Sequence, residues 1–249
     1  LSHDKPIFVR MRAMLALNEL KRPSAIPFLG NSLANDPDPG VRRIALGSLE
    51  QQDDFHAIPY FQQAMADTED DVRQSATVSL AVAVRKLVIA QQATNDQESI
   101  AVLRQITAVN LDALLRQPMT AQDIGNVSVQ QAAATAFGLI GNAESVTYLC
   151  KYLEELQSEE ASGEETDIQF LGKVKVLRTI VTALGDIGAI DAIPCLIATL
   201  QGSEDLSVKR LAVSALGRMG HDTCIPVLVD SFLRDGFVEL YRKLEAGTV

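Results

Sequence analysis

Hydrophobic residues recur along this chain in one nine-residue pattern, found six times as VRMRAMLAL, VRRIALGSL, VRQSATVSL, VQQAAATAF, VLRTIVTAL and VKRLAVSAL. With the first Val counted as position 0, each copy has Ala or Ile at position 4, Ala or Ser at position 7, and Leu or Phe at position 8. These positions share one face of an α-helix, so the pattern predicts six amphipathic helices, here called helices A. The small residue at position 7 predicts that a neighbouring helix approaches closely there. The copies begin at Val9, Val41, Val72, Val129, Val176 and Val208.

A second pattern follows five of the six copies in fixed register; the third copy is the exception. Ile-Pro begins nine residues after the last apolar residue of the first pattern, and Val146-Thr147 takes its place in the fourth copy. Proline is tolerated in the first turn of a helix, where its missing N–H would have no partner anyway. The pair therefore predicts the start of a second helix, helix B, and each unit is a helix A, a turn and a helix B. The Ile-Pro pairs begin at Ile26, Ile58, Ile193 and Ile225.

Two of the units are expanded, since the distances between successive Val residues are 32, 31, 57, 47 and 32. Helical periodicity continues through most of residues 81–117. We therefore expect a lengthened helix A, a turn near Asn95-Asp96 and a lengthened helix B, which together form an ordered protrusion. The fourth unit carries the segment 153–167, whose Ser, Gly and Glu content is typical of a mobile loop.

The turns that precede helices A are rich in acidic residues, which favour the N-terminus of a helix as caps and by their charge. A basic residue also follows the repeat Val in four copies. We interpret these basic residues as a ladder that reaches acidic groups of the adjacent unit, with a row of ligand-binding residues as the alternative. They are Arg10, Arg42, Arg73 and Lys209.

Together the motifs read D/E-x(1,2)-V-R-x(2)-A-x(2)-A/S-L followed by Ile-Pro-x-Leu, and they cover about residues 5–235. With them the chain resembles the HEAT-repeat superfamily, and its short units are most similar to the phycobilisome-lyase-type HEAT-like repeat. The resemblance implies an all-α superhelix, or solenoid, of about six two-helix repeats. We expect residues 1–249 to form one solenoid domain and, because the chain begins with Leu1, to be a piece of a longer protein.

Charge is unevenly distributed. The net charge is −10, but seven acidic residues and no basic ones lie in 153–167, which leaves −3 for the rest of the chain. Nucleic-acid binders usually display clustered Lys and Arg, so nucleic-acid binding is not expected. The acidic segment is interpreted as a solvated linker or as a contact for a basic partner. No uninterrupted apolar run reaches the roughly 18 residues that a membrane span needs.

The three cysteines are odd in number and widely spaced, so the sequence predicts no disulfide framework and a reducing cytoplasm. Cys195 is interpreted as a core residue. His221 and Cys224 have a spacing that suits two metal ligands, but no second pair follows, and a packed turn with a buried thiol is the simpler interpretation. The glycine pairs Gly138/Gly141 and Gly185/Gly188 are interpreted as C-caps of helices A.

Catalytic relatives can be tested by their residues. Deoxyhypusine hydroxylases are HEAT-like and use paired His-Glu motifs to hold iron, whereas His3, His56 and His221 of this chain are not followed by Glu. HEAT-like alkylpurine glycosylases use a basic face with aromatic residues, and here there is no Trp and no basic excess. We therefore predict no catalytic residue, no metal and no cofactor.

The remaining hypothesis is a non-catalytic scaffold or adaptor that binds a protein or peptide through its helix B surface. Five residues past the Ile of helix B lies a polar row, expected to be exposed, whose mixed character suits a protein surface. A subunit of a phycobilin lyase, or a related assembly factor, and a purely structural segment of a multidomain protein are the alternatives. The row consists of Asn31, Gln63, Lys151, Ala198 and Asp230.

Overall fold

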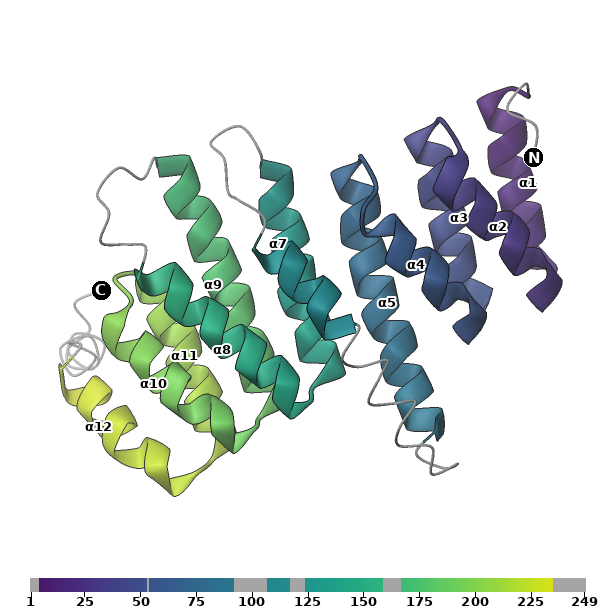
Figure 1. Ribbon diagram of the computed structural model, residues 1–249. Coiled ribbons are helices and arrows are strands. Elements are labelled where there is room, and N and C mark those ends of the chain that lie inside the picture. Colours follow the sequence, from purple (N-terminus) through teal and green to yellow (C-terminus); the bar gives the residue numbers. More distant parts are fainter. Residues whose placement is uncertain (1–4, 53, 92–106, 117–123, 159–166, 235–249) are drawn as a thin grey trace, which may run out of the picture.

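The helices A stack side by side along the molecule. The structure is a computed structural model that describes residues 5–52, 54–91, 107–116, 124–158 and 167–234, and these residues contain no β-strand. Each helix A contacts the next one in the chain (Figure 1). The helices A are α1 (Ile7–Glu19), α3 (Pro39–Gln52), α5 (Asp70–Gln91), α7 (Ile124–Ile140), α9 (Asp167–Ile187) and α11 (Leu206–Met219).

The helices B form the second layer of the solenoid. They are α2 (Ile26–Asn35), α4 (Ile58–Ala64), residues 107–115, α8 (Ala143–Ser158), α10 (Ile193–Gly202) and α12 (Ile225–Arg234). Four of them begin at the Ile of Ile-Pro, as predicted. In each of these four units a single 3-10 turn leads into helix B: η1 (Pro23–Ala25), η2 (Phe55–Ala57), η4 (Ile190–Ala192) and η5 (Asp222–Cys224). The predicted all-α solenoid of two-helix repeats is confirmed.

The fourth unit enters helix B differently. The Asn142 side chain accepts a hydrogen bond of 2.8 Å from the Ser145 N–H, so α8 is capped directly after α7 without a 3-10 turn. The helix consequently starts at Ala143, three residues before the expected Val146.

The expansion of the third unit lies partly within the described residues. Helix α5 has 22 residues against 13 in α1 and 14 in α3, which confirms the lengthened helix A. The expected turn near Asn95-Asp96 lies outside the described residues, and so does most of the expected protrusion. Of its helix B, residues 107–115 are described as helical.

The acidic segment differs from the expectation of a loop over 153–167. Its first six residues continue α8 to Ser158, because Leu153 and Leu156 are buried at 1% and 3% exposure and hold this end of the helix on the core. Glu155 in the same stretch pairs with Arg116. Residues 159–166 lie outside the described residues, and α9 begins at Asp167.

Small residues set the distance between successive helices A. A Cβ placed on Gly138 would lie 3.0 Å from the Cβ of Ala183, and one placed on Gly185 would lie 2.7 Å from that of Ala215. Ala183 and Ala215 occupy position 7 of the pattern, so the predicted close approach of a neighbouring helix there is confirmed. The described part of the chain has no helix before α1, and the equivalent Ala16 is therefore exposed.

The glycine pairs serve two purposes rather than one. Gly141 and Gly188 have φ of +63° and +67° and end α7 and α9, as C-caps do. Gly138 and Gly185 lie inside those helices, where they leave room for the next helix A. Their interpretation as C-caps was wrong, because the lateral neighbour that requires them is a full repeat away in sequence.

We expect Ala215→Leu to lower the free energy of unfolding by roughly 1 to 3 kcal/mol, because the larger side chain would overpack against Gly185. Ala183→Leu should behave in the same way. Urea unfolding followed by circular dichroism measures the change. Ala16→Leu, at the same pattern position but exposed, should stay within about 0.5 kcal/mol of the unsubstituted protein. Equal losses at all three positions would contradict the assigned contact.

Buried Arg–Asp pairs join the first three units. Arg10 donates two hydrogen bonds of 2.8 Å to Asp36, and Arg42 donates bonds of 2.8 and 2.7 Å to Asp67. Each Asp lies in the turn before the next helix A, and Arg42 also donates to the Asp36 carbonyl at 2.9 Å. The ladder between adjacent units is confirmed for these two basic residues.

The ladder does not continue through the other two basic residues. Arg73 pairs with Asp70 and donates to the Asp67 carbonyl at 2.8 Å, so it holds its own turn. Lys209 makes no ion pair with a described residue. In the fifth unit Leu177 replaces the Arg, and the matching acidic position of the next turn is Ser203.

The Asp67 carboxylate shows how such a pair depends on pH. Burial alone would raise its pKa, but the hydrogen bonds from Arg42 and from the Glu69 N–H outweigh burial and hold the pKa below the ordinary value. The stabilisation by this carboxylate is therefore fully present above the ordinary pKa of Asp. It is lost as the pH falls through the lowered pKa.

Arg42→Met should lower the free energy of unfolding by about 3 kcal/mol, because it leaves the Asp67 carboxylate buried without its partner. Arg43→Met is the matched control, since the Arg43–Asp71 pair is 54% and 70% exposed and such pairs contribute less than about 1 kcal/mol. Urea unfolding at neutral pH compares the two variants. If Arg42→Met loses no more free energy of unfolding than Arg43→Met, the assigned role of the buried Arg42–Asp67 pair is contradicted.

A disulfide links two neighbouring helices B. Cys150 of α8 and Cys195 of α10 are bonded, with their Cα atoms 5.7 Å apart and 45 residues between them in sequence. The prediction of no disulfide was wrong, and Cys195 is a bonded residue as well as a buried one. Sequence spacing did not reveal the pair because stacking of the repeats is what makes these positions adjacent. Cys224 is free and buried in η5, as expected for a packed turn.

A reducing agent should lower the free energy of unfolding by up to about 4 kcal/mol, the chain-entropy value for a closed loop of this length. The same reagent should leave the double variant Cys150→Ala/Cys195→Ala unchanged. Alkylation of the unfolded, unreduced protein should label one thiol, and alkylation after reduction should label all three. Three labelled thiols before reduction would show that the bond does not form.

Candidate binding groove on helices A

The row predicted on helices B is exposed to solvent. Asn31 on α2, Gln63 on α4, Lys151 on α8, Ala198 on α10 and Asp230 on α12 are all exposed. Asn31 accepts a hydrogen bond of 3.0 Å from Asn35, one turn further along its helix. Exposure at a shared register is the property that the row was expected to have, and its binding role stays a prediction.

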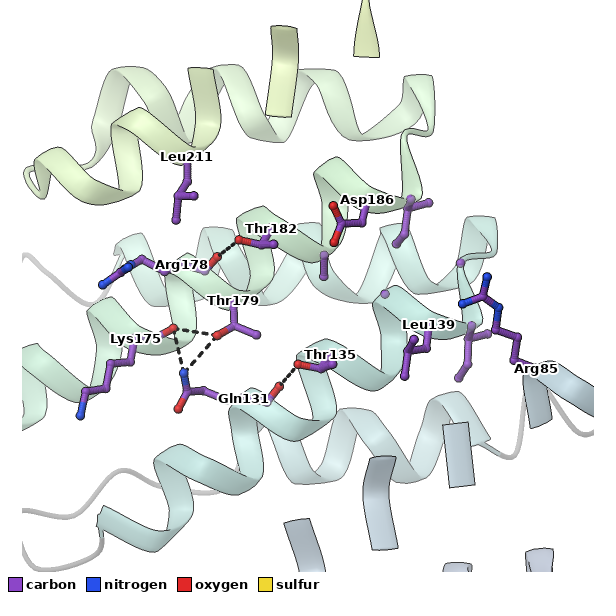
Figure 2. A pocket seen from close by; sticks show the side chains of 15 residues that line it. Arg85, Gln131, Thr135, Leu139, Lys175, Arg178, Thr179, Thr182, Asp186 and Leu211 are labelled. Carbon is purple, nitrogen blue, oxygen red and sulfur yellow. Dashed lines mark hydrogen bonds between the residues drawn. The ribbon is translucent and has the colours of Figure 1, made fainter. Parts of the chain in front are cut away.

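A groove of about 1040 Å³ lies on the helices A instead. Figure 2 shows it running along α7 and α9, with one side chain from α5 and one from α11 at its borders. Four successive repeats therefore contribute to it. The polar side chains that line it are Arg85, Gln131, Thr135, Lys175, Arg178, Thr179, Thr182 and Asp186.

The groove follows from the close approach of its two main helices. Gly138 and Ala183, which bring α7 and α9 together, also line the groove. The neighbouring outward positions carry Thr135, Thr179 and Thr182, which are short side chains that do not fill the space between the two helices. Short residues at the contact and beside it leave an open channel parallel to the helix axes.

The threonine hydroxyls of the groove are already used as donors. Thr135 donates to the Gln131 carbonyl and Thr182 to the Arg178 carbonyl, each at 2.8 Å, and Thr179 donates to the Lys175 carbonyl at 3.0 Å. The Gln131 amide donates across the groove to Thr179 at 3.1 Å, as the dashed lines in Figure 2 show. The hydroxyl oxygens of Thr135 and Thr182 consequently present lone pairs to a ligand.

Positive charge in the groove is not neutralised at short range. Arg85, Lys175 and Arg178 form no hydrogen bond or ion pair through their side chains with a described residue. Asp186, the acidic residue of the lining, is held by Arg218 at 3.0 Å. The pKa of Asp205 lies below its ordinary value chiefly because Ser207 donates a hydrogen bond to it, and the charge of Arg178 contributes.

A smaller hollow of about 500 Å³ lies between α3 and α5 and differs from the groove in how its basic side chain is paired. Arg43 and Asp71 form an ion pair of 3.0 Å in its lining, so its basic residue has a partner. The two hollows occupy corresponding positions on the helices A. The larger one differs because its basic side chains form no ion pair with a described residue.

The described histidines His56 and His221 bond within their own turns. His221 accepts the Thr223 N–H at the start of η5, and the ring of His56 lies 2.7 Å from Asp54 on a different turn. Within the described residues no group of three or more His, Cys, Asp or Glu side chains could hold a metal ion. Across the same residues, no helix has the length and apolar character of a membrane span.

Sequence reasoning missed the groove residues. A signal was present, because positions 3 and 6 of the pattern are Thr179 and Thr182 in the fifth copy and position 6 is Thr135 in the fourth. Lys175 and Arg178, three residues apart, also lie on one face of a helix. Only the lateral packing of α7 and α9 combines these residues into one site.

The sequence was compared with models of protein families. The model of HEAT repeats matches residues 1–81 and 168–244. The chain belongs to the HEAT-repeat family. The unmatched stretch between these ranges contains the two expanded units, whose lengths depart from the regular repeat.

A solved structure is similar in part to this HEAT-repeat chain. Human deoxyhypusine hydroxylase in complex with glycerol is 21% identical, with 93% of this chain and 86% of that chain covered and a TM-score of 0.33. No curated protein sequence matches the chain.

Proposed function

We propose that this HEAT-repeat chain is a non-catalytic scaffold that binds a segment of another protein. The groove on α7 and α9 is the observation that supports this function. It is a channel on the helices A of four successive repeats, and the polar part of its lining suits the main chain and polar side chains of a protein segment. Solenoids typically use such extended surfaces for recognition.

The alternatives fit this groove less well. A bilin chromophore, like other small ligands, calls for a concave and mostly apolar site, whereas Thr, Gln, Lys and Arg form much of this lining. A purely structural segment does not account for a groove whose basic side chains are exposed and form no ion pair with a described residue. Catalysis would need a nucleophile beside a base or a metal cluster, and the threonines of the groove bond only to backbone carbonyls and Gln131.

Two further surfaces belong to the proposal. The row on helices B, from Asn31 to Asp230, offers a second contact along the opposite layer of the solenoid. The acidic run, of which residues 153–158 belong to α8, is proposed as a contact for a basic partner. Neither surface is needed for binding in the groove.

The cytoplasmic localisation was predicted because no disulfide was expected, and the disulfide removes this basis. Structural disulfides form and persist mainly in oxidising compartments, and the bond between Cys150 and Cys195 is of this kind. We therefore propose no compartment on the basis of cysteine usage. The thiol count described above decides whether the protein made in its own cells carries the bond.

Affinity capture with paired variants tests the scaffold function. Thr135→Trp should block the groove, and Thr147→Trp is its matched control, since both threonines are exposed and both bond to the carbonyl four residues back. We expect the first variant to lose a partner that the control retains, with the free energy of unfolding within about 0.5 kcal/mol for both. The partner is then purified, and binding is measured directly.

The helix B row is tested in the same assay by the charge reversals Lys151→Glu and Asp230→Lys. Loss of the same partner would make the row part of the binding surface. If Thr135→Trp, Lys151→Glu and Asp230→Lys all capture the same proteins as the unsubstituted chain, the scaffold function is contradicted at both surfaces.

A further inference from the structure

The cations of the groove are separated along its length. In Figure 2, Lys175 and Arg178 of α9 lie toward one end, and Arg85 reaches the other end from α5, next to Leu139. The acidic side chain of the described lining, Asp186, is already paired with Arg218. Both ends of the groove therefore attract a negatively charged group.

The floor between the two ends offers acceptors. Thr135 and Thr182 have donated their hydroxyl protons to helix carbonyls, so their oxygens accept hydrogen bonds from a ligand. The N–H groups of an extended main chain are free to donate to such oxygens. A bound helix would have most of its N–H groups engaged within itself, so the floor favours an extended segment over a helical one.

The length of the groove limits the ligand. From Gln131 to Ile140 the lining extends over ten residues of α7, and the nine steps between them correspond to about 14 Å at the rise of an α-helix. An extended chain advances about 3.3 Å per residue, so about four residues span the same length. Leu139, Ile140 and Leu211 at the border suit an apolar side chain of the segment.

We propose that the groove binds an extended protein segment with acidic residues at both ends, separated by about four residues that include an apolar one. The carboxylates pair with Lys175 and Arg178 at one end and with Arg85 at the other. The main chain between them donates to the threonine oxygens. This inference rests on the proposed scaffold function and names the chemistry of the partner.

A nucleic-acid strand is the competing polyanion. Single-stranded nucleic acids are held by aromatic side chains on which the bases stack, together with a basic path for the phosphates. Among the described residues no aromatic side chain lines this groove, and the three cations of the lining lie at the two ends rather than in a continuous row. A segment with separated charges fits this arrangement better than an evenly charged backbone.

Fluorescence anisotropy with a labelled peptide tests the proposal. The probe is a peptide of about eight residues with two Glu at each end and Val, Thr, Leu and Gly between them. The comparison probes are the same peptide with Gln in place of each Glu and a labelled oligothymidine of similar length. We expect saturable binding of the acidic peptide, weakened by added salt because its charged contacts are exposed.

The variants separate the two parts of the site. Lys175→Gln/Arg178→Gln should weaken binding of the acidic peptide about tenfold or more, and Arg85→Gln should weaken it less because it removes a single charge. Thr182→Val removes an acceptor with little change in shape and should weaken binding a few-fold. Arg210→Gln is the control, since Arg210 has the same pattern position as Arg178 one repeat later and does not line the groove.

Each other outcome overturns the proposal. These outcomes are an acidic peptide that does not bind, a Gln peptide that binds equally well, and a control variant that loses as much affinity as Lys175→Gln/Arg178→Gln. Oligothymidine that displaces the peptide and depends on the same residues would make the groove a nucleic-acid site. If the peptide fails while Thr135→Trp still abolishes capture of a partner, the chemistry is wrong and the scaffold function stands.

Discussion

The close contact between successive helices A is the constraint on which this molecule depends. Gly138 against Ala183 and Gly185 against Ala215 leave no room for larger side chains, so α7, α9 and α11 stack at a fixed, short distance. In a solenoid each repeat contacts only its neighbours, so the spacing of these three helices sets how their surface residues lie relative to one another.

The two halves of the chain use different additional links between repeats. Two buried Arg–Asp pairs join the first three units, and each ties a helix A to the turn that begins the next one. In the fifth unit Leu177 replaces the Arg, and the matching turn residue is Ser203, so neither charge is left buried without a partner. There the close glycine contacts and the Cys150–Cys195 bond link the repeats instead.

The groove follows from the same packing. A contact made by Gly and Ala, flanked by threonines, leaves a channel that larger residues would have filled. The threonines also bond back to their own helices, which fixes the direction of their oxygens. The packing of α7 against α9 thus also produces a surface with ordered hydrogen-bond acceptors and separated cations. The function proposed for the chain depends on this combination.

The sequence by itself determined the helices and their order. The apolar periodicity of Val, Ala and Leu, the Ile-Pro pairs and the acidic caps act within one helix or one turn, so residues close in sequence are enough to reveal them. The small residue at position 7 even predicted a neighbouring helix. Only the tertiary structure decided which residues come together across repeats: Cys150 bonds to Cys195, Gly138 packs against Ala183, and Arg85 and Lys175 line the two ends of one groove. The physical reason is that these residues lie tens of positions apart in sequence, and a local pattern does not reveal which residue of the neighbouring repeat each one contacts.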